Sequence, residues 1–333
     1  MTLPGPVRRS SADVKHGAHP ILLADSVGAA PQWAAEHRDA VRAAVTEHGS
    51  LLVRGLTPRD PTEAEAIFRE LGALMTETEG FAERHVYAQG VYSASKWPPN
   101  QPMCVHHELS YAVEVPSLML FACIKPATRG GATTVADAAA VLEALPADLV
   151  KRFERLGWLL VRNYNDDIGT SLASAFGTEH RGEIERYCRA NAIEFEWRAG
   201  GALRTWQRRS ALVRHPLTGK RSWFNQVAFL SEWTMNSEVR EYLVEEYGQD
   251  ELPFNTRFGD GSPIDADVVD LISETYEANT VRAPWEAGDV LLVDNVRMAH
   301  GREALEGSRE VIVGMADPVR RADFSPTIDG VAG

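Results

Sequence analysis

Cysteine is scarce in this sequence. The 333 residues include three cysteines, Cys104, Cys123 and Cys188, and no two of them have the Cys-X-X-Cys spacing of redox and zinc motifs. An odd number of widely spaced cysteines argues against a disulfide framework and against a zinc ribbon. We therefore expect three free thiols, as is usual in a reducing cytoplasm.

Long apolar runs and an excess of positive charge are also lacking. The N-terminal stretch MTLPGPVRRSSADV has no apolar core of a signal peptide, and no later run approaches the ~20 apolar residues that cross a bilayer. Lys and Arg number 34 against 47 Asp and Glu, and the net charge of −13 disfavours binding to nucleic acid or to an anionic membrane. These absences predict a soluble, cytoplasmic protein that acts on a small molecule.

The remaining composition is that of a globular protein, with 44% hydrophobic and 24% charged residues. The length suits one elaborated domain. Both ends of the chain are rich in small, polar and helix-breaking residues, which pack poorly. We therefore expect a single domain over residues 21–323, between a poorly ordered N-terminus, residues 1–20, and a tail, residues 324–333.

Helix and strand signals occur in separate parts of the chain. Asp60 followed by Pro61 predicts a helix start, and Gly49 predicts a helix end. Helices are expected at PQWAAEHRDAVRAAVTEHG, AEAIFRELGALM, AAAVLEAL and ADLVKRFERLG, strands at SLLVRGL, WLLVRNY, GDVLLVDN and REVIVGMAD, and a hairpin around Pro-Leu-Thr-Gly in LVRHPLTGKRSWFN. Strands and helices do not alternate regularly, which favours an antiparallel barrel or jelly roll with added helices over a doubly wound sheet.

The stretch VHHELSY, residues 105–111, contains candidate metal ligands. Residues two apart on an extended strand point to the same side, so His106 and Glu108 can share one metal while His107 points away as a wall or supporting residue. Because two side chains hold a divalent ion weakly, a third ligand is needed, and the candidate is His300, just past the apolar run VLLVDN. Two imidazoles and one carboxylate form the facial triad of non-haem Fe(II) sites, which leaves positions open for chemistry.

A candidate anion-binding residue follows in EGSREVIVGM. On a strand Arg309, Val311 and Val313 share one face, so an arginine begins a row of apolar inward positions. A buried guanidinium needs an anionic partner, and a dicarboxylate is suitable because the two groups pair bidentately. The alternative is a solvated Arg309 beside Glu310.

Together these motifs resemble a known enzyme family. The chain contains, in order, HHELSY, PSLMLFACIKPATRGGATTVAD, VRNY, HPLTG, WFNQ and GDVLLVDNVRMAHGREALEGSREVIVGM. From about residue 45 to about residue 318 it resembles the iron(II)- and 2-oxoglutarate-dependent dioxygenases of the taurine dioxygenase and clavaminate synthase type. The resemblance implies a mainly β fold with helical decorations, whose core is a double-stranded β-helix (a cupin-like jelly roll) with a large insertion at about residues 138–280.

The resemblance also implies the cofactor and its ligands. It assigns His106, Glu108 and His300 to Fe(II), in agreement with the argument from strand alternation. 2-Oxoglutarate and O2 would be the cosubstrates. Thr133, in GGATT, matches a threonine that helps to bind 2-oxoglutarate in relatives, and Arg309 matches the arginine that holds its distal carboxylate.

Candidates for substrate binding are less sharply defined. Tyr111 in ELSY and Asn225 in WFNQ would face the site, with a structural hydrogen-bonding role as the alternative. His107 would line or support it. Arg320 is a candidate for binding a substrate carboxylate, as are three further arginines: Arg204, Arg297 and Arg302.

Two positions narrow the expected reaction. The taurine enzyme has a second arginine four residues after its cofactor arginine, whereas this chain has Val313 there, so a sulfonate substrate is not expected. Related halogenases have a small residue in place of the ligand carboxylate, whereas here Glu108 fills that position. The resemblance thus implies hydroxylation of an unactivated C–H bond, with release of succinate and CO2. Desaturation, cyclisation or epimerisation by the same chemistry stays open.

The expected substrate is a small amino acid or amino-acid-derived metabolite of specialised metabolism, either free or bound to a carrier protein. Two other classes of function compete with this one. A zinc-dependent hydrolase on a cupin-like barrel also uses His and Glu ligands, but it has no need for Arg309 or Thr133. A barrel that only binds a ligand would not need an intact triad together with an arginine.

Overall fold

The fold is built mainly from β-sheets with helices around them. The structure, a computed structural model, describes residues 7–9, 20–24, 28–81, 84–165 and 167–325. Its largest sheet has eight strands, in the spatial order β1 (Val7–Arg9), β2 (Pro20–Leu23), β3 (Ser50–Arg54), β17 (Val290–Asp294), β7 (Glu114–Lys125), β20 (Glu310–Arg320), β5 (Val91–Ser93) and β4 (Val86–Ala88). Apart from the parallel pair β2–β3, neighbouring strands in this sheet are antiparallel.

A smaller antiparallel sheet packs against the large one. Its four strands lie in the order β16 (Thr280–Arg282), β9 (Thr133–Asp137), β18 (Met298–Arg302) and β6 (Met103–His106). From β6 onwards the main strands alternate between the sheets along the chain: β6, β9 and β18 belong to the small sheet, and β7, β17 and β20 to the large one. Side chains from both sheets form one hydrophobic core.

The strand β7 is buried on both faces. Successive side chains of a strand point to opposite faces. On one face lie three residues of the core between the sheets: Met119, Phe121 and Cys123. On the other lie three residues of a second core, beneath the N-terminal helices: Leu118, Leu120 and Ala122. This arrangement requires an apolar residue at nearly every position, as the sequence SLMLFACI has.

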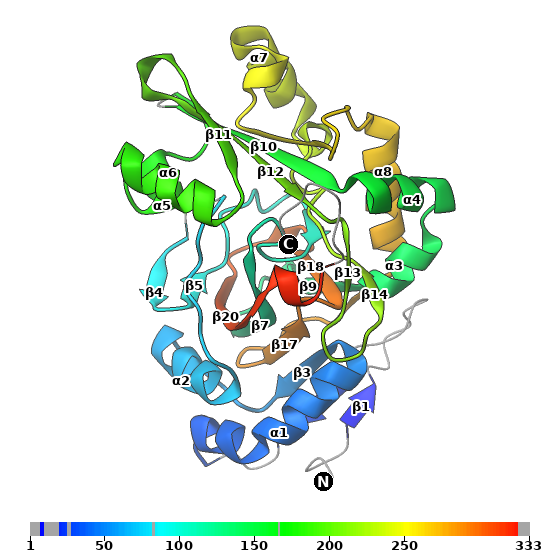
Figure 1. Ribbon diagram of the computed structural model, residues 1–333. Helices are drawn as coiled ribbons and strands as arrows, with labels where there is room; N and C mark the ends of the chain where they lie inside the picture. Colours follow the sequence, from blue (N-terminus) through cyan, green and yellow to red (C-terminus); the bar gives the residue numbers. More distant parts are fainter. Residues whose placement is uncertain (1–6, 10–19, 25–27, 82–83, 166, 326–333) are drawn as a thin grey trace.

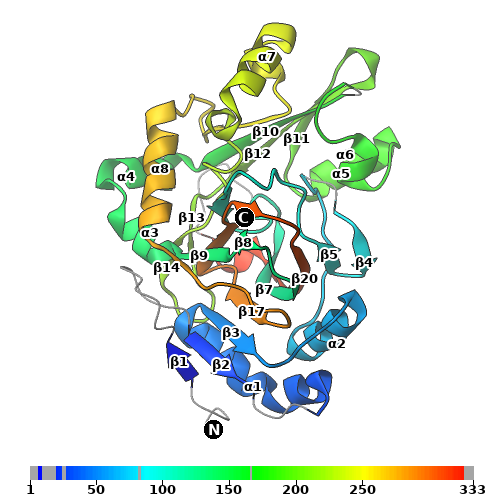
Figure 2. The same ribbon diagram turned by 180° about the vertical axis from the view of Figure 1, so that it is seen from behind.

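Two N-terminal helices cover the outer face of the large sheet (Figures 1 and 2). The helix α1 (Ala30–His48) ends at Gly49, whose φ of 84° is left-handed, as glycine permits. The helix α2 (Pro61–Leu71) begins after Asp60, whose side chain accepts a hydrogen bond from the Glu63 N–H at 2.8 Å. The structure confirms both helix boundaries expected from the sequence.

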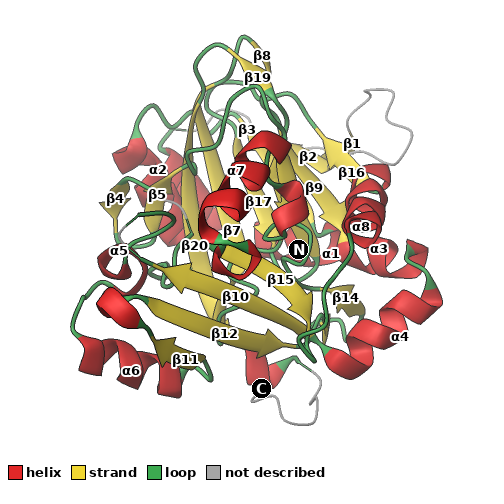
Figure 3. Ribbon diagram, turned by 90° about the horizontal axis from the view of Figure 1, so that it is seen from above, coloured by secondary structure: helices red, strands yellow, loops and turns green. Residues whose placement is uncertain are grey.

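Between β9 and β16 the chain leaves the two main sheets. It forms a third sheet, in the order β11 (Glu194–Trp197), β12 (Leu203–Arg209), β10 (Trp158–Tyr164) and β15 (Phe254–Phe258). The helices of this segment are α3 (Ala138–Ala144), α4 (Ala147–Leu156), α5 (Leu172–Phe176), α6 (Arg181–Ala190), α7 (Ser237–Tyr247) and α8 (Ala266–Ala278). Figure 3 shows β10, β12 and β15 as one layer, with α6 near one end and α4 near the other. In Figure 1 this layer lies on the side of the molecule opposite α1 and α2.

The same segment contains the hairpin predicted around Pro-Leu-Thr-Gly. Its strands are β13 (Leu212–Arg214) and β14 (Arg221–Trp223). His215 explains the turn, because its Nδ1 accepts hydrogen bonds from two backbone N–H groups of the turn while its Nε2 lies 2.7 Å from Asp294 Oδ2. The hairpin is thereby fixed to the end of β17. Short elements complete the chain: β8 (Arg129–Gly130), β19 (Leu305–Glu306), η1 (Ala199–Gly201), η2 (Glu232–Thr234), η3 (Gln249–Glu251) and η4 (Arg321–Asp323).

The ends of the chain differ from expectation. Most of the N-terminus predicted to be poorly ordered, residues 1–20, lies outside the described residues, but residues 7–9 form β1 and pair with β2. In the predicted tail, residues 326–333 lie outside the described part. Phe324 is buried against Phe224, so the packed part of the chain includes the first residue of the predicted tail, while the domain bounds of residues 21–323 stay a prediction. The aromatic ring of Phe324 fills a core position, which the small and polar residues next to it in the sequence do not indicate.

Two further expectations concern thiols and membranes. All three cysteines are free, as predicted. Among the described residues, no helix combines the length and apolar character that a bilayer-crossing segment requires.

Candidate active site

Three candidate metal ligands meet between the two main sheets. His106 ends β6, and His300 lies directly opposite it in the neighbouring strand β18. Glu108 follows His106 after one residue, and its Oε2 lies 3.6 Å from His300 Nε2. One ligand atom from each of the three side chains lies within 4.8 Å of the others, and all three residues are buried. A buried set of two imidazoles and one carboxylate at this spacing suits one divalent ion.

The structure brings these three residues together in a different way from that expected. The sequence predicts one extended strand through His106 and Glu108, but β6 ends at His106 and Glu108 lies in a turn. The turn continues through Leu109, which has a positive φ of 53°. His300 was placed just beyond a strand, whereas it lies inside β18. The cross-strand pair brings His106 and His300 together, and the turn after β6 brings Glu108 to them. Alternation along a single strand does not explain this arrangement.

The surroundings of His106 prepare it to bind a metal. Its Nδ1 lies 2.9 Å from the Cys104 carbonyl oxygen, which favours a proton on Nδ1 and leaves the Nε2 lone pair for a cation. Burial and, to a smaller extent, the nearby His300 lower the pKa of His106 to about 4, so the imidazole is neutral at physiological pH. The ring of Phe229 stacks on it with centroids 4.1 Å apart. Orientation and protonation state are thus both set for ligation.

Glu108 is held at both its carboxylate and its backbone. Burial by itself would raise the pKa of this carboxyl, but Arg84 and the two histidines hold it well below its usual range. Arg84 Nη2 lies 3.2 Å from each carboxylate oxygen. The Asn295 side chain accepts a hydrogen bond from the Glu108 N–H at 2.8 Å and donates one to the Glu108 carbonyl at 3.0 Å. Glu108 is therefore ionised, and its position in the turn is fixed.

Arg84 and Asn295 were not found from the sequence. Asn295 follows directly on the apolar run VLLVD and precedes His300 by five positions, so a polar residue at that strand end was a weak signal. Arg84, in GFAERHVY, has no neighbouring pattern that distinguishes it from a surface arginine. Both act on Glu108 through contacts between distant parts of the chain, which local patterns do not reveal.

His107 points away from the triad. Its side chain is fully buried, its Nδ1 lies 2.6 Å from the Asn295 carbonyl oxygen, and its ring lies beside Phe224. Burial lowers the pKa of His107 to about 3, so it is a neutral residue of the core. It supports the turn from behind, as one of the two sequence alternatives held, and it does not line the cavity that contains the triad.

Arg309 and Thr133 lie in the same small cavity as the triad. Arg309 Nη2 donates a hydrogen bond to Thr133 Oγ1 at 3.1 Å, while its Nε has no partner among the described residues. Burial lowers the pKa of Arg309 to about 10, and no carboxylate of the described chain pairs with it. This cavity has a volume of about 50 Å³ and an apolar wall on one side. Its lining also includes eight polar or charged residues: Arg84, Ser95, His106, Glu108, Thr133, His300, Arg302 and Arg309. A guanidinium without a counter-charge beside a metal-binding set fits a ligand with a distal carboxylate.

The structure places three other candidates away from this cavity. Tyr111 donates its hydroxyl proton to the Glu79 carbonyl at 2.9 Å. Asn225 donates to the Ala211 carbonyl and accepts from a backbone N–H, which is the structural role given as its alternative. Arg320 is exposed at the far end of β20, opposite Glu114. Their positions do not support a role in substrate binding, which stays a prediction for all three.

The three additional arginines also differ in position. Arg204 donates to Asn163 Oδ1 and pairs with Glu251. Arg297 pairs with Asp137 and so joins β18 to the start of α3. Arg302 reaches the metal cavity, but it donates to the carbonyls of residues 98 and 101.

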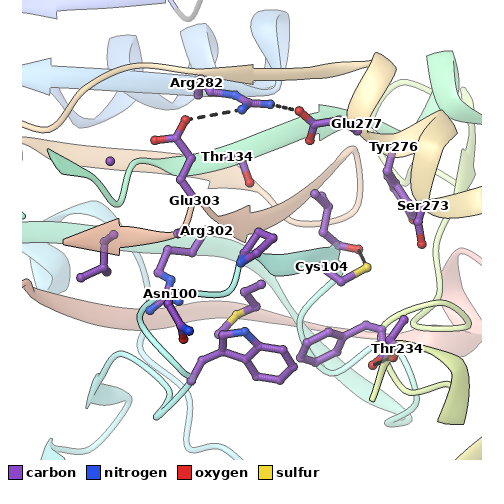
Figure 4. A pocket seen from close by; sticks show the side chains of 18 of the residues that line it. Asn100, Cys104, Thr134, Thr234, Ser273, Tyr276, Glu277, Arg282, Arg302 and Glu303 are labelled. Atoms are coloured by element: carbon purple, nitrogen blue, oxygen red, sulfur yellow. Dashed lines mark hydrogen bonds and ion pairs between the residues drawn. The ribbon is translucent and has the colours of Figure 1, made fainter. Parts of the chain in front are cut away.

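Two larger cavities adjoin the metal cavity. One, which we call the outer cavity, has a volume of about 950 Å³ and lies between the small sheet and α8 (Figure 4). Met103 and Arg302 line both it and the metal cavity. One of its arginines, Arg282, is paired and lies between Glu277 and Glu303, as the dashed lines in Figure 4 show. Arg302 instead donates to the carbonyls of residues 98 and 101.

The second, which we call the Arg84 cavity, has a volume of about 830 Å³. It lies between residues 76–80, the strands β4 and β5, and the helix α5. Arg84 and Glu77 are among its lining residues. It therefore adjoins the metal cavity on another side from the outer cavity, and Arg84, which contacts Glu108, lies between the two.

Comparison with known proteins identifies the family. The taurine catabolism dioxygenase TauD, TfdA family matches residues 19–316. The chain belongs to this family. Dapdiamide synthesis protein DdaC of Enterobacter agglomerans is 36% identical over 276 residues, which are 83% of this chain and 84% of that protein. Clavaminate synthase-like protein At3g21360 of Arabidopsis thaliana is 27% identical over 280 residues, 81% of this chain and 82% of that protein.

Solved structures show a similar fold. PvcB, an iron- and alpha-ketoglutarate-dependent oxygenase from an isonitrile synthetic pathway, superposes with a TM-score of 0.51 at 16% identity, over 92% of this chain and 89% of that one. For this TauD/TfdA enzyme, family and site together establish a dioxygenase that uses Fe(II), with 2-oxoglutarate and O2 as cosubstrates. The family assignment confirms the resemblance noted in the sequence and excludes the zinc-dependent hydrolase.

Proposed function

We propose that this dioxygenase hydroxylates an unactivated C–H bond of a small amino acid or amino-acid-derived metabolite, free or carried on a carrier protein, with release of succinate and CO2. One observation carries the proposal. The triad shares a buried cavity with a guanidinium that lacks an anionic partner and with the threonine bonded to it.

In this proposal His106, Glu108 and His300 hold Fe(II), while Arg309 and Thr133 hold the distal carboxylate of 2-oxoglutarate. The donor set suits this ion, because two imidazoles and one carboxylate supply three ligand atoms and leave positions for cosubstrates. When bound, the iron and 2-oxoglutarate supply the oxidising chemistry, and the protein supplies position and a dry site.

The residues around the triad exclude water and fix the ligands. Phe229 covers one face of His106, and Phe121 lies against His300 with ring centroids 5.3 Å apart. Val311 and Val313 line the cavity next to Arg309, on the strand face that the sequence indicated. An apolar wall of this kind removes water from the reacting groups and strengthens charge interactions inside the site.

Two side chains select among reactions of this chemistry. Glu108 occupies the ligand position that a halide would need, which supports hydroxylation over halogenation. Val313 lines the cavity at the position where the taurine enzyme has its second arginine, which supports a substrate other than taurine. The relative DdaC acts in dapdiamide synthesis, which supports a role in specialised metabolism.

We also propose a fold type and domain bounds for this chain. Alternation of the main strands between two sheets supports a double-stranded β-helix of the cupin-like jelly-roll type. We propose one dioxygenase domain over residues 21–323, with the third sheet and its helices as an insertion at about residues 138–280. A cytoplasmic location stays a prediction from the sequence.

Anaerobic addition of Fe(II) and then 2-oxoglutarate to the metal-free protein tests the assigned site. We expect a weak visible metal-to-ligand band in the wild type, and weaker 2-oxoglutarate binding in Arg309→Met. Absence of the band in the wild type would contradict the proposal.

Succinate release is then measured across free and carrier-linked amino acids, and the product's mass identifies the reaction. A gain of one oxygen atom indicates hydroxylation, a loss of two hydrogen atoms indicates desaturation or ring closure, and an unchanged mass with altered chirality indicates epimerisation.

A further inference from the structure

Arg84 lies between the metal cavity and a larger space that opens beside it. Its guanidinium is 3.2 Å from both oxygens of Glu108 through Nη2, and its Nε is 3.8 Å from Glu77 Oε2. The side chain is only 10% exposed. Among the described residues, it alone lines both the metal cavity and the Arg84 cavity. Any molecule that reaches the triad from the Arg84 cavity therefore meets this guanidinium.

The ion pair between Arg84 and Glu108 weakens when the triad binds its metal. A divalent cation is the largest charge in such a site and takes up much of the carboxylate's negative charge. Arg84 is then a buried cation close to a dication. A buried guanidinium that loses its counter-charge is strongly disfavoured, so the metal-loaded site favours a further anion at Arg84.

Glu77 does not meet this need. Its distance of 3.8 Å from Arg84 Nε exceeds that of a hydrogen bond, and Nε has no hydrogen-bond partner among the described residues. Burial raises the pKa of Glu77 to about 7, although Arg84 opposes the shift, so the carboxyl is partly protonated near neutral pH. Arg84 therefore keeps an unused donor and an incompletely balanced charge.

The wall around Arg84 is built rigidly, as a recognition site requires. The Glu77 N–H donates to the Tyr92 hydroxyl at 2.6 Å. Two residues further on, the buried Glu79 carboxylate accepts hydrogen bonds from Tyr187 at 2.9 Å and from Gln207 at 2.5 Å. These contacts connect the loop to α6 and β12, so the segment between β9 and β16 holds one wall of the Arg84 cavity in place.

We propose that Arg84 is a specificity-determining residue that binds a carboxylate of the organic substrate, which enters through the Arg84 cavity. The inference rests on the proposed function and adds a substrate class: small acids with a free carboxylate near the carbon that reacts. A guanidinium pairs with a planar carboxylate through two hydrogen bonds, whereas a carboxamide or ester offers neither the charge nor two equivalent oxygens. A substrate bound by Arg84 lies beside the metal and is not itself a ligand of the metal.

A purely structural role for Arg84 is the competing explanation. In that case the arginine would only hold Glu108 in place for the metal. The two roles differ in their consequences, because loss of a positioning residue weakens metal binding, whereas loss of a substrate anchor weakens only the binding of carboxylates.

The test uses protein loaded anaerobically with Fe(II) and 2-oxoglutarate. The probes are the free L-amino acids, their N-acyl derivatives and small dicarboxylic acids, each compared with the carboxamide of the same skeleton. Binding is measured from perturbation of the visible band and by calorimetry. We expect at least one acid to bind wild type, and its carboxamide to bind roughly 10- to 100-fold more weakly.

The variants are Arg84→Met and Arg84→Lys, with Arg240→Met as a matched control. Arg240 also pairs with a buried glutamate, Glu232, but it lines neither the metal cavity nor the Arg84 cavity. We expect Arg84→Met to lose the preference for the acid, Arg84→Lys to keep part of it, and the control to match wild type. Melting temperatures of all variants show whether each one folds.

The inference would be overturned by equal binding of acid and carboxamide by wild type, by unchanged acid binding by Arg84→Met, or by failure of every probe to bind. Loss of the iron and 2-oxoglutarate band in Arg84→Met alone would assign the residue to positioning Glu108, which also rejects the inference. Absence of that band in the wild type would instead contradict the proposed function.

Discussion

The outer cavity and the Arg84 cavity are similar in size, at about 950 and 830 Å³, but differ in how their charges are paired. In the outer cavity Arg282 is balanced by Glu277 and Glu303. In the Arg84 cavity the arginine's nearest carboxylate belongs to a candidate metal ligand, Glu108. Cavity volume therefore does not distinguish the cavity that recognises a substrate. The pairing of the arginine does, because the positive charge of Arg84 is balanced mainly by the carboxylate of Glu108.

The largest effect is expected from changes to the metal triad, which both cavities adjoin. We expect His106→Ala and Glu108→Ala each to abolish turnover, because two remaining ligands hold a divalent ion weakly. Iron content after dialysis and succinate release measure the effect. Full iron retention by either variant would mean that another residue completes the site.

A second prediction concerns the side of the metal cavity assigned to the cosubstrate. We expect Arg309→Met to weaken 2-oxoglutarate binding by about 100-fold, since a charged, two-point interaction is lost. Thr133→Val should weaken it by only about 3- to 10-fold, because one neutral hydrogen bond is lost. The visible band titrated with 2-oxoglutarate gives both values. Equal effects of the two changes would contradict the assigned division of roles.

A third prediction separates the adjacent histidines. We expect His107→Ala to retain iron but to lower the free energy of unfolding by about 2–4 kcal/mol, because a fully buried ring and its contact with Asn295 are removed. Denaturant unfolding and iron content are the measurements. Loss of iron from a variant that still folds would show that His107 acts on the metal site.

The smallest effect is expected in the outer cavity. Arg282→Ala removes partly exposed ion pairs, which contribute about 0–1 kcal/mol each. We therefore expect the free energy of unfolding to fall by no more than about 2 kcal/mol. We expect kcat/KM to stay close to that of wild type, because Arg282 does not line the metal cavity. A loss as large as that of Arg84→Met would remove the distinction between the cavities and identify the outer one as the route of a substrate or cosubstrate.

Local features of the fold could be predicted because their causes are local. Asp60 starts α2 because its side chain accepts a hydrogen bond from the Glu63 N–H in the first turn. Gly49 ends α1 by adopting a left-handed φ. The apolar run of β17 indicated a strand buried on both faces, and each of its residues is buried. In each case a few neighbouring residues determine the structure.

The site was predictable only in part, because its assembly depends on distant contacts. The spacing of His106 and Glu108 suggested a shared metal, but Leu109 gave no sign of the positive φ that makes the turn. Arg84 and Asn295 became visible only when the fold placed them against Glu108. Arg320 lies at an exposed strand end, because β20 continues through residue 320, and its role in substrate binding stays a prediction.

The cross-strand pair of His106 and His300 has a consequence for how such an enzyme changes over evolution. The spacing of two metal ligands is fixed by the backbone ladder between β6 and β18, while the loop beside Arg84 is fixed by α6 and β12. Substitutions in the segment between β9 and β16 can therefore reshape the Arg84 cavity without moving the histidines. If the Arg84 cavity recognises the substrate as proposed, a lineage with this arrangement can acquire new substrates by changing that segment while its metal site stays the same.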